Sequence, residues 1–217
     1  MMETNSIQKE LLLASYLFEY PSKEWWGDVK ECAAEAHTVE RPQSREVLEE
    51  FFDYVEESDP KEYEDAYVRA FDFSQNTNLY LTTHNRTDFG KQSEEMLAYK
   101  QLFLDAGYDL DHELPDYLPA LLEFLSHVPP ADAQELLGGA VHVIAHIAEN
   151  LQSYGSPYAA VLKAAAALSP VAPQPLTEPP VRDMDEAMET FGPDWQGIEP
   201  LLKPSVQTVR FYPKGRH

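Results

Sequence analysis

Apolar residues recur every three or four positions through most of the first 168 residues, a spacing that lets one face of a helix be buried. Leu13, Leu17 and Tyr20 form such a stripe, which stops at Pro21 because proline interrupts a helix. No convincing alternation of apolar and polar residues, the pattern typical of strands, is found. Helices are expected over residues 7–20, from 22, from 44, over 60–71 and 91–106, from 118, and over 132–153 and 157–168. The sequence therefore predicts an all-α bundle.

Several of these expected helices carry start or end signals. Asp59 and Pro60 form a strong start, because aspartate accepts hydrogen bonds from free amides and proline fits the first helical position. Ser22 and Ser44 are the expected first residues of two further helices, since serine is a favourable cap. Gly107 is expected to end the helix that precedes it.

The character of the chain changes near residue 169. Nine of the 17 prolines lie in the last 48 residues, where the helical spacing of apolar residues disappears. A segment of this kind buries too little apolar surface to offset the entropy that it loses on ordering. We therefore expect a single helical domain over residues 6–168, followed by a flexible or loosely docked Pro-rich tail over residues 169–217.

The chain is strongly acidic, with 16 Lys and Arg against 38 Asp and Glu and a formal net charge of −22. This balance argues against nucleic acid as a partner, because phosphate binding needs a basic surface. A basic peptide is a more natural partner, attracted at long range. The alternative is that the acidity serves solubility or reflects a salty cytoplasm.

The sequence also indicates where the chain acts. It has no apolar run of about 18 residues, the length needed to cross a bilayer. Its N-terminus makes a poor signal peptide, and its one cysteine, Cys32, excludes an internal disulfide framework. We expect a cytoplasmic protein without membrane insertion.

Candidates for a catalytic or metal site are weak. His142 and His146 have the i, i+4 spacing of zinc-binding pairs, but no general-base glutamate lies between them, so structural histidines are favoured. A metal-dependent helical hydrolase that uses His84 and His112 is the remaining alternative. Its further ligands would come from Asp88, Asp111, Glu113 and Asp116. The favoured expectation is a protein that is not an enzyme and holds no metal or cofactor.

The irregular stretch between residues 71 and 91 and the turn at 113–117 are the strongest candidates for a binding surface. They combine apolar anchors with negative charge, which suits a groove for a basic amphipathic helix. The expected anchors are Tyr67, Phe71, Phe73, Leu79 and Tyr80, and the expected acids are Asp72, Asp88, Glu113 and Asp116. The alternatives are core packing for Tyr67 and Phe71 and a helix-capping role for Asp116.

Two runs of the sequence resemble a known family. They are YVRAFDFSQNTNLYLTTH at residues 67–84 and ELPDYLPALLEFL at residues 113–125. Together they resemble the NarJ family, the delta-subunit molybdenum cofactor assembly chaperones of respiratory nitrate reductase. This family is part of the TorD/DmsD group of redox-enzyme maturation chaperones. The likeness covers roughly residues 8–165.

Two motifs of that group carry the resemblance. Its Tyr-x-x-Leu-Phe motif is matched by Tyr67, Ala70 and Phe71, with alanine in place of leucine. Its Glu-Pro-x-Asp-His motif is matched at residues 113–117 in the Glu-Leu-Pro-Asp-Tyr form of NarJ-like proteins. This match adds Tyr117 to the candidate peptide contacts. Because Tyr117 replaces a histidine, a role that needs an imidazole there does not carry over.

The resemblance implies a TorD-like helical fold and a chaperone that is not itself a catalyst. Its partner would be the apo catalytic (alpha) subunit of a molybdopterin nitrate reductase, bound through the N-terminal segment of that subunit. It would assist insertion of the molybdenum cofactor before the enzyme docks on the membrane. The alternative is a chaperone of the same type for another molybdopterin oxidoreductase. The group includes both monomers and dimers.

Overall fold

The computed structural model describes residues 2–72, 74, 76–84, 89–108 and 113–176. The chain divides into two units, Met1–Pro180 and Val181–His217, and the second lies wholly outside the described residues. The elements are α1 (Met2–Leu17), α2 (Lys23–Ala36), α3 (Pro42–Glu57), α4 (Pro60–Phe71), the 3-10 helix η1 (Leu81–His84), α5 (Phe89–Asp105), α6 (Leu118–His127), α7 (Pro130–Ser153) and α8 (Tyr158–Ala166).

The predicted all-α class is confirmed. In the described ranges, β structure is limited to one isolated antiparallel bridge between Tyr80 and Tyr117. No described helix is both long and apolar enough to cross a membrane. Of the predicted tail, residues 177–217 lie outside the described part of the chain.

Three of the helix signals read from the sequence are confirmed. The Ser22 hydroxyl accepts a hydrogen bond from the Trp25 amide at 3.2 Å, and the Asp59 carboxylate accepts one from the Lys61 amide at 2.9 Å. Gly107 follows α5 with a φ of +82°, a left-handed conformation that glycine adopts without steric cost. These local contacts set where α2 and α4 begin and where α5 ends.

Two expectations near helix ends are wrong. Helix α3 begins at Pro42, and Ser44 is buried within its first turn. Proline fits the first turn because the amide that it lacks would have no helical partner there. Tyr20 does not continue the buried stripe, because α1 ends at Leu17 and the Tyr20 side chain is 47% exposed.

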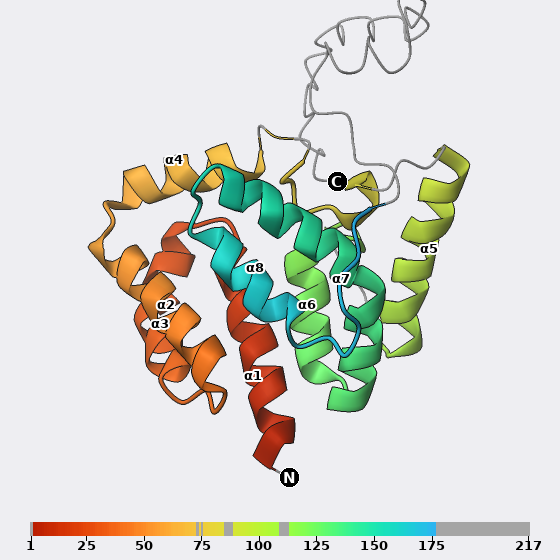
Figure 1. The fold of residues 1–217 in the computed structure, drawn as a ribbon, viewed down its shortest axis with the longest axis horizontal. Coiled ribbons are helices and arrows are strands. Elements are labelled where there is room, and N and C mark those ends of the chain that lie inside the picture. Colours follow the sequence, from red (N-terminus) through yellow and green to blue (C-terminus); the bar gives the residue numbers. More distant parts are fainter. Residues whose placement is uncertain (1, 73, 75, 85–88, 109–112, 177–217) are drawn as a thin grey trace, which may run out of the picture. The chain divides into compact units, whose positions relative to one another are not determined.

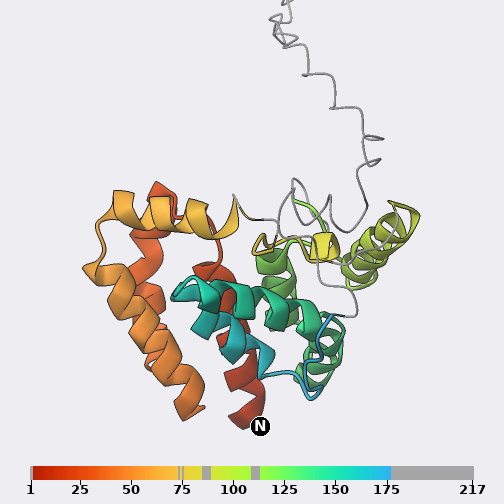
Figure 2. The same cartoon turned by 45° about the horizontal axis from the view of Figure 1, so that its top comes forward.

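Helix α1 lies at the centre of the first unit (Figure 1). It packs most extensively against α6 and also contacts α2, α7 and α8. Figures 1 and 2 both place α2, α3 and α4 to one side of α1 and α5 at the opposite margin. Helices α7 and α8 form a hairpin whose turn contains Gly155, with a φ of +69°.

The core is held together by an aromatic cluster centred on Tyr158 of α8, which is 1% exposed. The rings around it come from α3, α4 and the end of α1, with centroids 4.8 to 6.3 Å from its own. They belong to Phe18, Phe51, Tyr63, Tyr67 and Phe71. Aromatic pairs of this kind contribute about 0.5–1.5 kcal/mol each beyond their area burial. Helix α8 is therefore the element that joins α3, α4 and α1.

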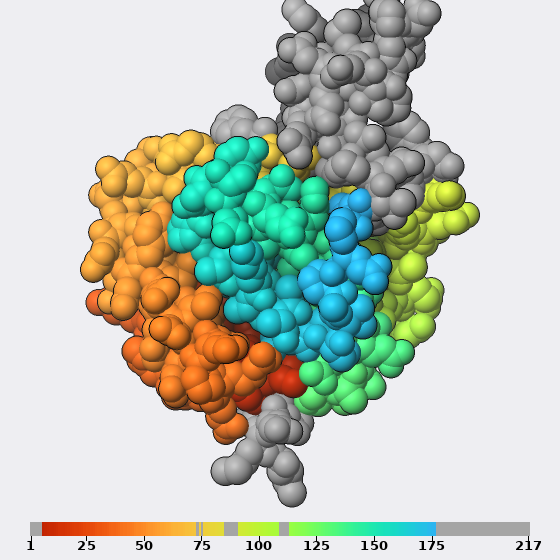
Figure 3. Space-filling model, in the orientation of Figure 1, coloured from red at the N-terminus to blue at the C-terminus, as the bar shows by residue number. Residues whose placement is uncertain are grey.

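The chain after α8 runs along α7, where Figure 3 shows it in blue beside α7 and α8. The Gln174 amide donates to Nδ1 of His142 at 2.9 Å, and the Val171 side chain lies against Gly138. A Cβ atom at Gly138 would lie only 3.0 Å from Cγ2 of Val171, so glycine permits this close approach. Residues up to 176 thus pack on the helical body.

Candidate functional site

The two sequence motifs meet in space. The Leu81 amide donates to the carbonyl oxygen of Asp116 at 3.0 Å, and the Leu118 amide donates to the carbonyl oxygen of Leu79 at 2.8 Å. These bonds form the isolated bridge between Tyr80 and Tyr117 and lie where η1 and α6 begin. The motifs are therefore two halves of one junction.

Asp116 lies inside this junction, with 0% of the residue exposed. Its Oδ2 accepts hydrogen bonds from the Thr82 amide at 3.1 Å and from the Thr82 hydroxyl at 2.6 Å. The carboxyl group thus caps the first turn of η1 from a distant part of the chain, as an N-cap residue does within its own helix. Its Oδ1 is buried without a hydrogen-bond partner in the described structure. Asp116 holds the two motifs together and does not reach solvent.

His84 closes η1 and is also 0% exposed. Its Nε2 lies 2.9 Å from the carbonyl oxygen of Asn78, so this nitrogen carries the proton and donates. Burial lowers the pKa of His84 to about 4, so the imidazole is neutral near pH 7. The ring also packs edge-on against His146 of α7, with centroids 5.9 Å apart. His84 therefore fixes η1 against α7.

Three of the predicted apolar anchors are buried. Tyr67 and Phe71 are 4% exposed and Leu79 is 3% exposed. The Tyr67 hydroxyl donates to the carbonyl oxygen of Phe18 at 2.8 Å, and the Phe71 ring lies edge-on to the Phe18 ring. In this conformation these three side chains support the surface from beneath.

The other predicted contacts surround the junction at the surface. Tyr80 and Tyr117 are partly buried, with ring centroids 5.1 Å apart and an interplanar angle of 35°. The Tyr80 hydroxyl donates to the exposed Glu113 carboxylate at 3.3 Å. Asp72 is exposed. Asp88, like Phe73, lies outside the described residues.

Two residues that the sequence analysis missed extend this surface. Tyr20 packs edge-on to Tyr67 with centroids 5.7 Å apart, and Leu114 is 51% exposed within the second motif. The helix break at Pro21 was the available signal that Tyr20 leaves the buried stripe. We call this surface the motif face; it comprises Tyr20, Asp72, Tyr80, Glu113, Leu114 and Tyr117.

The motif face presents protonated tyrosines beside carboxylates. Burial, and next the charge of Glu113, raises the pKa of Tyr80. Burial also raises the pKa of Tyr117 to about 12, again with a contribution from Glu113. Both hydroxyls therefore stay protonated near pH 7 and can donate hydrogen bonds. The exposed carboxylates of Asp72 and Glu113 would attract a cationic ligand.

The described residues do not form a metal centre. Among them, no group of three or more His, Cys, Asp or Glu side chains is arranged to hold a metal ion. The remaining members of the hydrolase alternative, Asp88, Asp111 and His112, lie outside the described part of the chain. His142 accepts from the Gln174 amide, and Nε2 of His146 lies 3.0 Å from Nδ2 of its helical neighbour Asn150.

Comparison with known proteins gives the family. A family model described as nitrate reductase delta subunit matches residues 40–164. A probable nitrate reductase molybdenum cofactor assembly chaperone NarJ from Bacillus subtilis is 30% identical over 162 residues, which are 74% of this chain and 88% of that relative. The chain belongs to the nitrate reductase delta subunit family. The resemblance seen in its two motifs is thereby confirmed.

Other relatives also match this chain, and the match covers different shares of each relative's length. The nitrate reductase molybdenum cofactor assembly chaperone NarJ of Escherichia coli K12 is 29% identical over 153 residues, covering 69% of this chain and 65% of the relative. The nitrate reductase-like protein NarX of Mycobacterium tuberculosis is 29% identical over 154 residues, covering 64% of this chain but 24% of NarX. The family match contains both halves of the motif junction.

Proposed function

We propose that the chain is a chaperone for maturation of a molybdopterin nitrate reductase. It binds the N-terminal segment of the apo catalytic subunit and assists insertion of the molybdenum cofactor, without catalysing a reaction itself. The observation that carries this proposal is the 30% identity to a NarJ chaperone over 88% of that relative's length. The family match over residues 40–164 supports it further.

We place the contact with the N-terminal segment on the motif face. Its tyrosines and Leu114 supply apolar contact area, and its carboxylates select a segment that carries positive charge. The junction beneath, held by Asp116 and Thr82, keeps these side chains in fixed positions, which lowers the entropy cost of binding. The buried side chains of Tyr67, Phe71 and Leu79 contribute by packing beneath the motif face. Because the cofactor is inserted before the enzyme docks on the membrane, we expect the chain to work in the cytoplasm.

Co-purification from cells respiring on nitrate tests this function. The tagged full chain should capture the catalytic subunit of the host nitrate reductase, and removal of that subunit's N-terminal segment should abolish capture. The captured subunit should contain less molybdenum than the mature enzyme. Equal capture with and without the segment would contradict the proposed contact, and capture of a different molybdoenzyme would favour the alternative client.

A matched pair of variants tests the place of contact. Leu114→Arg adds a cation to the motif face, whereas Leu97→Arg makes the same change at a leucine of α5 that is 64% exposed. Leu114→Arg should weaken binding of the N-terminal segment about tenfold, because it replaces an apolar contact and repels a basic ligand. Leu97→Arg should leave affinity unchanged. Equal effects of the two variants would place the segment elsewhere.

A further inference from the structure

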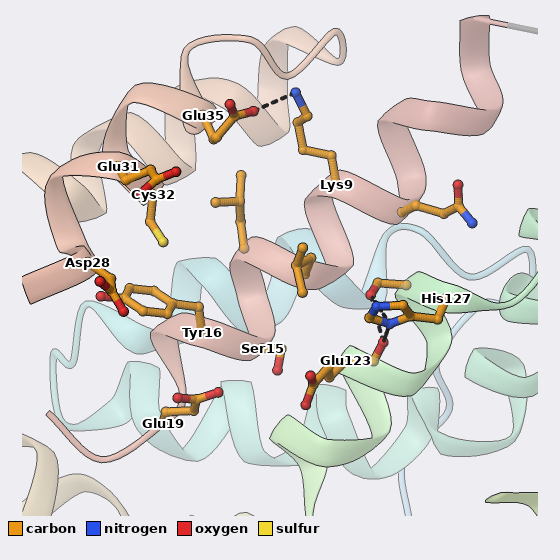
Figure 4. Close-up of a pocket in the computed structure, with 14 residues that line it drawn as sticks. Lys9, Ser15, Tyr16, Glu19, Asp28, Glu31, Cys32, Glu35, Glu123 and His127 are labelled. Atoms are coloured by element: carbon orange, nitrogen blue, oxygen red, sulfur yellow. Dashed lines mark hydrogen bonds and ion pairs between the residues drawn. The ribbon is translucent and has the colours of Figure 1, made fainter. Parts of the chain in front are cut away.

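A groove with a volume of about 630 Å³ runs along α1, between α2 and α6 (Figure 4). Its apolar floor is formed by Leu12, Leu13, Tyr16 and Cys32. Leu12 is 46% exposed, although residues of α2 and α6 line the same groove. The lining runs from Gln8 of α1 to Glu19, just past the end of that helix, and spans about 16 Å at about 1.5 Å per residue. This length matches about three turns of a docked helix. We call this feature the α1 groove.

The rim of the α1 groove is acidic. Five carboxylates line it: Glu19, Asp28, Glu31, Glu35 and Glu123. The one lysine in the lining, Lys9, already pairs with Glu35, with its Nζ 2.7 Å from Oε2. Within the described part of the chain, the other four carboxylates form no ion pair. The groove therefore carries an excess of negative charge over an apolar floor.

Two of these carboxylates repel one another. Glu19 follows α1, Glu123 lies on α6, and both are exposed at the same end of the groove (Figure 4). Partial desolvation of its carboxyl group within the groove raises the pKa of Glu19, and the charge of Glu123 adds to the shift. A cation placed between them would relieve this repulsion.

We infer that the α1 groove docks an amphipathic helix of a protein partner, about three turns long, with Lys or Arg on its polar face. Its apolar face would cover Leu12 and Tyr16, and its cations would lie beside the free rim carboxylates. Charge complementarity selects this occupant. A second copy of the chain, with its net charge of −22, would bring like charges together. The α1 groove is distinct from the motif face, and docking there can be measured without a reductase.

A synthetic amphipathic helix with leucines on one face and arginines on the other is a suitable probe, titrated into the full chain by calorimetry. Three variants make one chemical change at three exposed leucines. These are Leu12→Arg in the α1 groove, Leu114→Arg on the motif face and Leu97→Arg on α5, where the leucines are 46%, 51% and 64% exposed. Leu12→Arg should weaken binding at least about tenfold, because it removes an apolar anchor and repels the peptide's cations. Leu97→Arg should bind as the unmodified chain does, and Leu114→Arg should leave the peptide in the groove in place and remove only any second peptide bound at the motif face.

Other outcomes would overturn the inference. Undiminished binding to Leu12→Arg would mean that the groove is not the docking site. Loss in Leu114→Arg alone would place the helix on the motif face, and equal loss in all three variants would indicate attraction to bulk charge. Self-association of the unmodified chain that Leu12→Arg abolishes would assign the groove to a second copy instead.

A second pair of variants keeps the test decisive if Leu12→Arg fails to fold. Asp28→Asn/Glu31→Gln neutralises two exposed rim carboxylates, and Glu56→Gln/Glu57→Gln makes the same change in charge on α3. Only the first pair should weaken binding several-fold at low salt and reduce its salt dependence. Equal effects of the two pairs would contradict docking in the groove.

The single cysteine provides a direct readout of position. Cys32 lies in the floor of the groove and is the only cysteine of the chain. A probe peptide with an activated disulfide on its apolar face should label Cys32 faster than a peptide of the same composition in scrambled order. Equal labelling rates would show that the amphipathic helix does not approach this floor.

Discussion

Replacing Asp116 by alanine should destabilise the fold far more than the loss of an exposed helix cap. The side chain is 0% exposed, and its Oδ2 accepts from both the amide and the hydroxyl of Thr82. Thr82 is itself 1% exposed, so water cannot replace the lost acceptor without opening the junction. The substitution therefore removes the cap of η1 and leaves a buried donor unsatisfied.

The size of the effect follows from these contacts. A buried amide left without an acceptor costs about 1–3 kcal/mol, and loss of the hydroxyl bond adds about 1 kcal/mol. We therefore expect Asp116→Ala to lower the free energy of unfolding by about 2–4 kcal/mol, against about 1 kcal/mol for a typical exposed cap. For a chain of this size, that loss lowers Tm by roughly 5–15 °C.

Chemical and thermal denaturation of the full chain measure this loss. Thr82→Val keeps the amide bond and removes only the hydroxyl, so it should cost about 1 kcal/mol. The double variant should cost less than the sum of the two, because both changes remove the same hydrogen bond. Glu113→Ala, at an exposed position in the same turn, is the control and should cost under about 1 kcal/mol. A loss from Asp116→Ala no larger than that of Glu113→Ala would refute the role of this carboxyl group in holding the junction.

Three further predictions concern stability. The pKa of His84 is lowered from 6.5 to about 4, so the unfolded state takes up its proton first as pH falls. The contribution of neutral His84 to the free energy of unfolding is thus full above about pH 6.5 and is lost as the pH falls towards 4. The loss should reach up to about 3 kcal/mol. His84→Gln should flatten this part of the curve of stability against pH. Asp59→Ala should cost about 1 kcal/mol in urea unfolding, because it removes the α4 cap; a change below the error of the measurement would contradict the capping role. Tyr158→Ala should cost about 3–5 kcal/mol or prevent folding, and a smaller loss would mean that the aromatic cluster collapses around the gap.

Much of the helical framework could be predicted from the sequence, because helices and their ends depend on contacts within a few residues. Ser22, Asp59 and Gly107 mark helix ends through hydrogen bonds or a backbone conformation that the local sequence specifies. The family could be recognised from its two motifs for a related reason, since short sequence motifs can be matched without knowledge of the packing. Ser44 was wrongly expected to begin α3, because serine and proline are both favourable at helix starts and Pro42 lies two residues earlier.

The candidate site depended on tertiary structure. Helical spacing shows that Tyr67 and Phe71 share an apolar stripe, but only the packing of Tyr158 against them shows that the stripe is buried. Likewise, a turn containing Asp116 is visible in the sequence, whereas its burial depends on Thr82 approaching from the other motif.

The sequence alone determined an acidic, all-α chain of the nitrate reductase delta subunit type, with most of its helices in place. Only the tertiary structure decided which motif residues form the motif face and which support it from within. It also placed the acids of α2 and α6 on either side of α1, which creates the α1 groove. The periodicity of the sequence shows whether a helix face is apolar or charged. It does not show which distant helix packs against that face, because that depends on contacts between residues far apart in the chain.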